Sequence, residues 1–232
     1  MRSRTFSILL SLVLFAGWSA FEVATSATAS AEEPATITFA FDFPNSDPAH
    51  YTISVDSNGR AKYECAAKTS ADSEELETYQ YEFNFSGANR DRIFDLASQA
   101  HYFAGKVDSG NRKLAFTGSK KLTYQDGQHS YSAGYNYSGL PAVQRLTELF
   151  QKVAATLEYG RHLDYYHRYQ KLALDDELKS MEVQAKSNEL SEMQAVQPIL
   201  QKIFEDASVM NVVRARAERL IASTKAAGSA IR

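Results

Sequence analysis

Two side chains in the C-terminal half have the types and the spacing of an acid–base or metal-binding pair. Asp164 and His167 lie three positions apart in a segment that also contains His162 and Arg168. On a helix, residues three apart lie on one side, so a carboxylate and an imidazole could share a proton or a metal ion there. This spacing is the basis of one hypothesis, an envelope enzyme of the metal-assisted hydrolase kind.

A solvated helix face is the interpretation that we favour for the same segment. Asp164 can pair with Arg168 four positions later, while the neighbouring tyrosines pack on a sheet. His162 and His167 are five positions apart and diverge by about 140° around a helix, so they do not form an i, i+4 chelate. We therefore predict no catalytic residue, no metal site and no cofactor.

Catalytic motifs with a stricter pattern are absent from the sequence. No Gly-x-Ser-x-Gly, Ser-x-x-Lys or His-Glu-x-x-His occurs, which argues against serine hydrolases, penicillin-recognising enzymes and zinc proteases. Gly105 and Gly110 have the spacing of a phosphate-binding loop, but Asn111 and Arg112 stand where that loop requires Lys followed by Ser or Thr. An enzyme is thus the less favoured class.

Aromatic residues near a predicted turn are candidates for ligand contacts. Asp126-Gly127 is a two-residue turn signal, and Tyr124 and His129 lie beside it. Tyrosines that stack on sugar rings would make this hairpin a carbohydrate-binding module, which is the second alternative function. Tyr131 and Tyr135 share the apolar register of the hairpin, however, and this favours a place in the core.

Arginines near the C-terminus are the remaining binding candidates. Arg214 and Arg219 belong to a basic run that could bind an anionic polymer. Arg214 and Glu218 are also an i, i+4 pair, which is typical of a charged outer helix face and is the interpretation that we favour.

The N-terminal residues have the pattern of a secretory leader. Arg2 and Arg4 precede an apolar stretch from Phe6 to Trp18, and Ala29-Ser-Ala31 resembles a cleavage site. The apolar stretch is shorter than the roughly 20 residues that span a bilayer, which favours a removed signal peptide at residues 1–31 over a retained anchor. We expect an exported protein, periplasmic or secreted.

Composition excludes several classes of partner. The net charge of −3 is too small and of the wrong sign for a nucleic-acid-binding protein. No second apolar segment approaches membrane-spanning length, so we expect no stable membrane insertion after cleavage. Cys65 is the single cysteine, which excludes an intrachain disulfide and suggests a small buried side chain on a strand.

The region before residue 140 has the alternating pattern of strands. Its aromatic residues recur at every second position, as half-buried strands require. Two hairpins are predicted, each with the register that puts the apolar residues of both strands on one face of the sheet. A three-residue loop at Ser57-Asn58-Gly59, with Gly59 left-handed, puts Ile53 opposite Tyr63. The two-residue turn at Asp126-Gly127 puts Leu122 opposite Tyr131. Between them, residues 89–97 are predicted to form a helix.

From Leu140 the apolar period changes to that of helices. Pro141 suits the first turn of a helix, and apolar stripes continue to about residue 221. Gly160 is expected to interrupt or bend the helical segment. The last helix is expected to be capped by Asp206 or Ser208 and to include Arg216 in its stripe. The fold class that we predict is α+β: an antiparallel sheet of about six strands with one packed helix, followed by an all-α region of three to four helices. The predicted domains are the signal peptide at 1–31, the sheet domain at 32–139 and the helical domain at 140–232.

The first half resembles a domain of unknown function found in uncharacterised exported bacterial proteins. The residues with this resemblance are Tyr51–Tyr63, Ile93–Ala97 and Lys120–Gly127, and the segment Ser208–Ala217 is similar to the tail of such proteins. The resemblance implies export and assigns no activity and no functional residue. The leading hypothesis is therefore a soluble, non-enzymatic protein that binds an unknown protein or envelope component through the seam between its halves.

Overall fold

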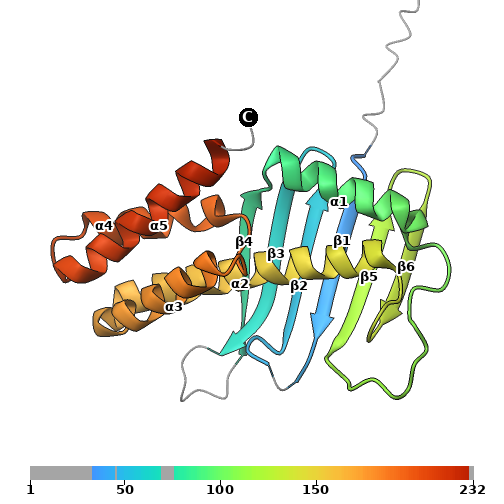
Figure 1. The fold of residues 1–232 in the computed structure, drawn as a ribbon, viewed down its shortest axis with the longest axis horizontal. Helices are drawn as coiled ribbons and strands as arrows, with labels where there is room; N and C mark the ends of the chain where they lie inside the picture. Colours follow the sequence, from blue (N-terminus) through green and yellow to red (C-terminus); the bar gives the residue numbers. More distant parts are fainter. Residues whose placement is uncertain (1–32, 45, 69–75, 230–232) are drawn as a thin grey trace, which may run out of the picture. The chain divides into compact units, whose positions relative to one another are not determined.

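The computed structural model describes residues 33–44, 46–68 and 76–229 (Figure 1). The predicted leader, residues 1–31, lies outside the described residues. Among the helices described, none combines the length and the apolar character that a membrane span requires.

Six antiparallel strands form one sheet in the N-terminal half, as the sequence predicts. The spatial order is β4-β3-β2-β1-β5-β6, so β1 is central and the fifth strand returns to pair with it. The strands are β1 (Thr36–Asp42), β2 (His50–Asp56), β3 (Arg60–Lys68), β4 (Leu76–Asn84), β5 (Ser119–Gln125) and β6 (Ser130–Tyr135).

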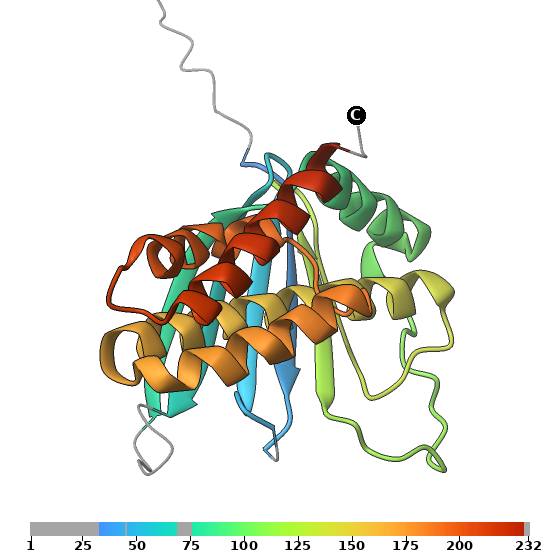
Figure 2. The same cartoon turned by 60° about the vertical axis from the view of Figure 1, so that its left-hand side comes forward.

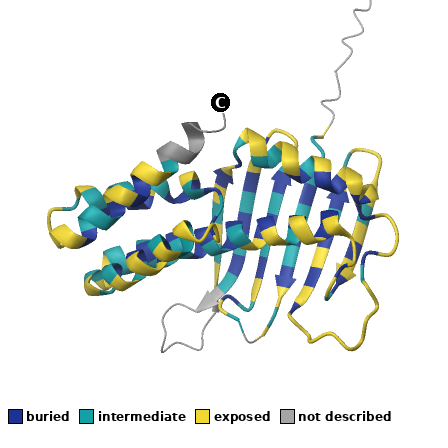
Figure 3. Cartoon of the chain, viewed as in Figure 1, coloured by how far each residue is buried: buried dark blue, intermediate teal, exposed yellow. Residues whose placement is uncertain are grey.

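One face of the sheet is apolar because every second residue of each strand points to it. In β1 the alternation buries Ile37, Phe39 and Phe41, and Figure 3 shows the same banding of buried and less buried residues along neighbouring strands. The opposite face is polar, with an ion pair between Lys62 and Glu64. The predicted alternation is confirmed.

The β2–β3 hairpin has the predicted register. Ile53 lies opposite Tyr63, and Tyr51 lies opposite Cys65. Gly59 has a φ of 88°, the left-handed conformation that a three-residue loop with a bulge requires at this place. Asp56 supports the loop by accepting from the backbone N–H groups of Asn58 and Arg60. Cys65 is buried, as expected.

The predicted register of the β5–β6 hairpin is wrong by two residues. Gln125 pairs with Ser130 and Leu122 with Ala133, so the loop contains four residues, Asp126 to His129. The Asp126 carboxylate accepts from the backbone N–H groups of Gln128 and His129, which closes the wider loop. A slip of two preserves the face of every side chain, because the side-chain period is also two.

Two helices cover the apolar face of the sheet, one from each half of the chain (Figure 1). Helix α1 (Gly87–Gln99) begins two residues before the predicted start at Asn89, and it is capped by Ser86, whose side chain accepts from the Asn89 N–H. Helix α2 (Pro141–Tyr169) packs Phe150 on Phe39, with ring centroids 5.3 Å apart.

The C-terminal half is helical, with four α-helices among the described residues. They are α2, α3 (Leu174–Lys186), α4 (Gln197–Glu205) and α5 (Asn211–Ser229), and the 3-10 helices between them are η2 (Lys171–Ala173) and η3 (Met193–Val196). A further 3-10 helix, η1 (His101–Phe103), follows α1 in the N-terminal half. Pro141 and Pro198 stand in the first turns of α2 and α4. Gly160 does not interrupt α2.

The two halves share one hydrophobic core. Residues from Glu32 onward form one compact unit, and buried side chains continue from the sheet through α2 into α3, α4 and α5. Helices α3–α5 lie beyond the β4 edge of the sheet (Figures 1 and 2). The Tyr81 hydroxyl of β4 donates to the Ala195 carbonyl of η3 over 2.6 Å. Whether residues 32–139 and 140–232 are separate domains stays a prediction.

Candidate functional site

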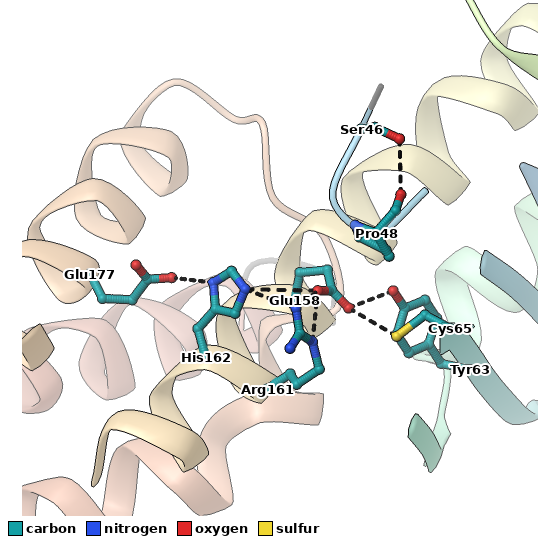
Figure 4. A network of polar contacts seen from close by, with 8 residues as sticks. All are labelled: Ser46, Pro48, Tyr63, Cys65, Glu158, Arg161, His162 and Glu177. Carbon is teal, nitrogen blue, oxygen red and sulfur yellow. Dashed lines mark hydrogen bonds and ion pairs between the residues drawn. The ribbon is translucent and has the colours of Figure 1, made fainter. Parts of the chain in front are cut away.

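A buried carboxylate lies where helix α2 crosses strand β3. Glu158 is 9 % exposed, and its Oε1 accepts from the Tyr63 hydroxyl at 2.6 Å and lies 3.5 Å from the Cys65 Sγ. Its Oε2 accepts two hydrogen bonds from Arg161, at 2.8 and 2.7 Å. Figure 4 shows these side chains converging from strand and helix.

The same cluster continues to the next helix. His162 Nδ1 lies 2.9 Å from Glu177 Oε1 in α3, and His162 Nε2 lies 2.9 Å from Arg161 (Figure 4). We call these residues the Glu158 cluster: Tyr63, Cys65, Glu158, Arg161, His162 and Glu177. It connects β3 to the consecutive helices α2 and α3, and Tyr63 and Glu158 are 95 positions apart in the sequence.

The chemistry available to the Glu158 cluster is limited by burial. Burial, together with the negative charge of Glu158, raises the pKa of the Cys65 thiol to about 12 and raises the pKa of the Tyr63 hydroxyl as well. A thiol nucleophile needs a lowered pKa and access to solvent, and Cys65 is only 2 % exposed. The cluster therefore fits a structural role, in which a buried charge is paired and fully hydrogen-bonded.

Asp164 and His167, the predicted catalytic candidates, have different partners. Asp164 pairs with Arg168, which is the predicted i, i+4 pair. The Nε2 of His167 lies 3.0 Å from Asp206 Oδ2, in the turn between α4 and α5. The structure thus pairs Asp164 with Arg168 and places His167 beside Asp206, so the two candidates contact different residues.

Asp206 is the centre of a second polar cluster at the far end of the helical half. The Asp206 cluster consists of His167, Lys171, Asp206 and Ser208. The Lys171 Nζ lies 2.7 Å from Asp206 Oδ2, and the Ser208 hydroxyl donates to Oδ1 at 2.6 Å. Lys171 and then Ser208 are the main causes that lower the pKa of Asp206.

The Asp206 cluster also corrects the predicted start of the last helix. The sequence suggested Asp206 or Ser208 as the cap, whereas α5 begins at Asn211. Asp206 instead closes a turn by accepting from the Ser208 N–H at 2.9 Å, and it joins that turn to His167 near the end of α2 and to Lys171 in η2.

Tyr124 and His129 do not form an exposed pair at the hairpin tip. Tyr124 is 9 % exposed, and its hydroxyl donates to Asp126 Oδ2 at 3.0 Å. Burial, followed by this hydrogen bond to Asp126, raises the pKa of Tyr124 to about 12. His129 has an exposed side chain and stacks on Tyr131 with centroids 5.9 Å apart. Tyr135 is buried and bonded to Thr147.

Arg214 and Arg219 are both engaged by the protein itself. The predicted Arg214–Glu218 pair is replaced by a bond from Arg214 Nε to the Phe204 carbonyl at 2.7 Å. Arg219 pairs with Glu182 of α3 at 2.8 Å. Arg216, which the sequence placed on an apolar stripe, pairs with Glu182 as well. These arginines hold α5 against its neighbouring helices.

Lys120 is a buried cation on the apolar face of the β5–β6 hairpin. It is 5 % exposed, and its Nζ donates to the carbonyl oxygens of Thr117, Gly118 and Asn136 over 3.0–3.2 Å. Desolvation lowers the pKa of this lysine. It lines a cavity of ≈ 430 Å³. Because the ammonium is surrounded by acceptors, it anchors the preceding loop.

A groove of ≈ 1040 Å³ lies at the seam between the two halves, and we call it the seam groove. Its walls come from α1, α2, the end of α3, the segment 188–194 and α5. Leu149, Leu190 and Leu220 contribute apolar lining. Grooves between elements that share a core are the usual place for ligand or partner binding. The sequence predicted a role for the seam but none of the residues that line it.

One wall of the seam groove is held by Glu192, which is 5 % exposed. Its carboxylate accepts from the backbone N–H of Ser86 at 2.8 Å and from the Ser86 hydroxyl at 2.7 Å, at the start of α1. Asn89 donates to the same carboxylate at 2.5 Å. Glu192 has a φ of 58°, a conformation that costs free energy and is stabilised here by these bonds.

The seam groove has an excess of positive charge. Five basic side chains line it (Arg92, Arg145, Lys152, Lys186 and Arg219), against three acidic ones (Glu148, Glu182 and Glu192). Although burial opposes it, hydrogen bonds from Arg219 and Arg216 hold the pKa of Glu182 below its usual value. The groove is therefore cationic on a chain whose net charge is −3.

Metal binding has no structural support in the part of the chain that is described. No group of three or more His, Cys, Asp or Glu side chains there is arranged to hold an ion.

The fold and the site together define an α+β protein with a helix-covered antiparallel sheet and a groove at its seam. Comparisons with models of known protein families and with curated proteins find no match to this chain.

Proposed function

We propose that this chain is an exported, non-enzymatic protein that binds a partner in the seam groove. The observation that supports this most is the groove itself, because both the sheet half and the helical half contribute side chains to it. The proposed location, periplasmic or secreted, rests on the leader pattern and on the resemblance to exported bacterial proteins. A mature protein that begins at Glu32 is the expected product.

The polar clusters outside the groove support a binding role over catalysis. In the Glu158 cluster the thiol and the phenol are buried, and in the Asp206 cluster each charged group has a partner. Catalysis needs a reactive group that meets substrate, with a pKa near the working pH. The enzyme hypothesis based on Asp164 and His167 has less support, because these residues face separate partners.

The carbohydrate-binding alternative also has less support. It requires several tyrosines that present their rings to solvent, as stacking platforms for sugars. Tyr124 and Tyr135 are buried, and each hydroxyl is bonded within the protein.

Site-specific photo-crosslinking tests the proposed function. A photoreactive amino acid replaces Lys186 at the groove, and in a matched control it replaces Lys121, an exposed lysine on the open sheet face. In envelope preparations of the source organism, we expect one discrete adduct from position 186 that is missing from position 121. The captured partner is identified by mass spectrometry, and its binding is then measured with purified proteins.

Two results would contradict the proposal. One is the same set of adducts from both positions, which would indicate random collisions. The other is an identified partner that binds the purified wild-type protein and a groove-blocked variant, Ala185→Trp, with equal affinity.

A further inference from the structure

The rim of the seam groove contains exposed cations that have no direct ion-pair partner among the described residues. Among the described residues, Arg92, Arg145 and Lys186 form no ion pair, and all three are exposed. Lys152, by contrast, pairs with Glu148 at 2.8 Å. Cations of this kind attract an anionic partner and fix its orientation.

The groove walls determine the backbone conformation of a bound peptide. Much of the wall comes from helices α1, α2, α3 and α5, whose interior main-chain groups are satisfied within each helix, so these parts of the wall offer mainly side chains to a ligand. An extended peptide would lose the hydrogen bonds of its own backbone to water in such a groove. A helix satisfies its own backbone and suits these walls.

The floor of the groove limits the contribution of apolar contacts. Leu149, Leu190 and Leu220 are 5 %, 8 % and 3 % exposed, so little of their surface remains to be covered. Met193 and Ala185 are half-buried and add a modest apolar strip. Charge therefore contributes a large share of the affinity, and the binding must weaken with salt.

We propose that the seam groove binds an acidic amphipathic helix of a partner protein. Its apolar side lies on the floor, and its carboxylates face Arg92, Arg145 and Lys186. This inference rests on the proposed function and names the chemistry of the partner.

Designed peptides test the inference with the full mature chain. One labelled amphipathic helix has Glu on its polar face, and a second has Lys at the same positions. By fluorescence anisotropy, we expect the acidic helix to bind at least about tenfold more tightly than the basic one. Raising the salt from low to physiological concentration must weaken its binding.

Charge-reversal variants test the site. We expect Arg92→Glu with Arg145→Glu to weaken binding of the acidic helix by about tenfold or more. The matched control is Arg112→Glu with Lys113→Glu, which makes the same change in net charge in an exposed loop outside the groove. Equal effects of the two pairs would overturn the inference, because the binding would then follow net charge alone.

The remaining outcomes separate the inference from the proposed function. One such outcome is tighter binding of heparin or of phosphatidylglycerol vesicles than of the acidic helix. If the Arg92→Glu and Arg145→Glu variant also lost that binding, the inference would be overturned. A partner crosslinked at position 186 that the acidic helix does not displace would also overturn it, while the proposed function would stand.

Discussion

Asp206 accepts hydrogen bonds from Lys171, His167 and Ser208 at the turn between α4 and α5. At the residue scale, these contacts show that Asp164 and His167 can have the spacing of a catalytic pair and still have structural roles. His167 is oriented by a residue 39 positions away, not by Asp164 three positions away. The i, i+3 spacing predicts which residues lie on the same side of a helix. It gives no information on residues from other segments, such as Asp206, that form hydrogen bonds with those residues instead.

We predict that Asp206→Asn destabilises the protein at neutral pH and that the effect fades in acid. The folded-state pKa of Asp206 lies below its ordinary value of 3.8. Its stabilising contribution is thus fully present above pH 3.8 and is lost as the pH falls toward the folded-state pKa. Melting curves of the variant and the wild type should differ by a few degrees at pH 7, and the difference should shrink as the pH falls below 3.8 toward the folded-state pKa.

The control for this prediction is Asp95→Asn, an exposed carboxylate whose hydrogen-bond partner among the described residues is Gln99 of the same helix. It should change the melting temperature little at any pH. A wild-type advantage over Asp206→Asn that is the same at pH 7 and pH 3 would contradict the role assigned to the ionised carboxylate.

At the element scale, α2 is the helix that joins the two halves. It packs Phe150 on the sheet, places Glu158 against β3 and approaches η3 closely at Gly160. A Cβ atom on Gly160 would lie 2.6 Å from Val196 Cγ1. The sequence suggested that Gly160 bends or interrupts the helix, whereas the structure uses its small size for close packing.

We predict that Gly160→Ala destabilises the protein although alanine favours helices. Overpacking of a tight contact costs about 1–3 kcal/mol, which exceeds the gain of about 1 kcal/mol in helix propensity. Val196 is β-branched and stiff, so it cannot move aside easily. Urea unfolding should show a lower free energy of unfolding for this variant.

A double-mutant cycle checks the cause. Val196→Ala removes the clashing methyl group, so Gly160→Ala should cost less in that background. Gly139→Ala is the control, because a Cβ there meets nothing within 4 Å. Equal costs of Gly160→Ala with and without Val196 would contradict the explanation.

At the scale of the whole molecule, the sheet depends on helices from the other half of the chain. Its apolar face includes Phe39, Ile53 and Leu122, each fully buried, and α2 covers part of this face. A sheet with an uncovered apolar face has little reason to remain folded in water.

We predict that residues 32–139 alone do not unfold cooperatively, whereas residues 32–170, which include α2, show a transition. Circular dichroism during thermal or urea unfolding measures this difference. The predicted division into a sheet domain and a helical domain makes the opposite claim. A cooperative transition of residues 32–139 by themselves would support that division.

Much of the fold could be predicted because it depends on local periodicity. The alternation in β1 and the conformation of Gly59 follow from neighbouring residues, and so does the change to helical spacing near Leu140. The β5–β6 register was wrong by two residues because Asp126 can close either a two-residue or a four-residue loop, and both keep the same side chains on the apolar face.

The sequence by itself determined the strands, the helices and the single change in apolar periodicity from that of strands to that of helices. Only the tertiary structure decided the partners of Glu158, His167 and Arg214, and only it created the seam groove. The physical reason is that periodicity depends on residues a few positions apart. A hydrogen bond or a groove depends on which distant segments pack together, and that choice is made by the whole core.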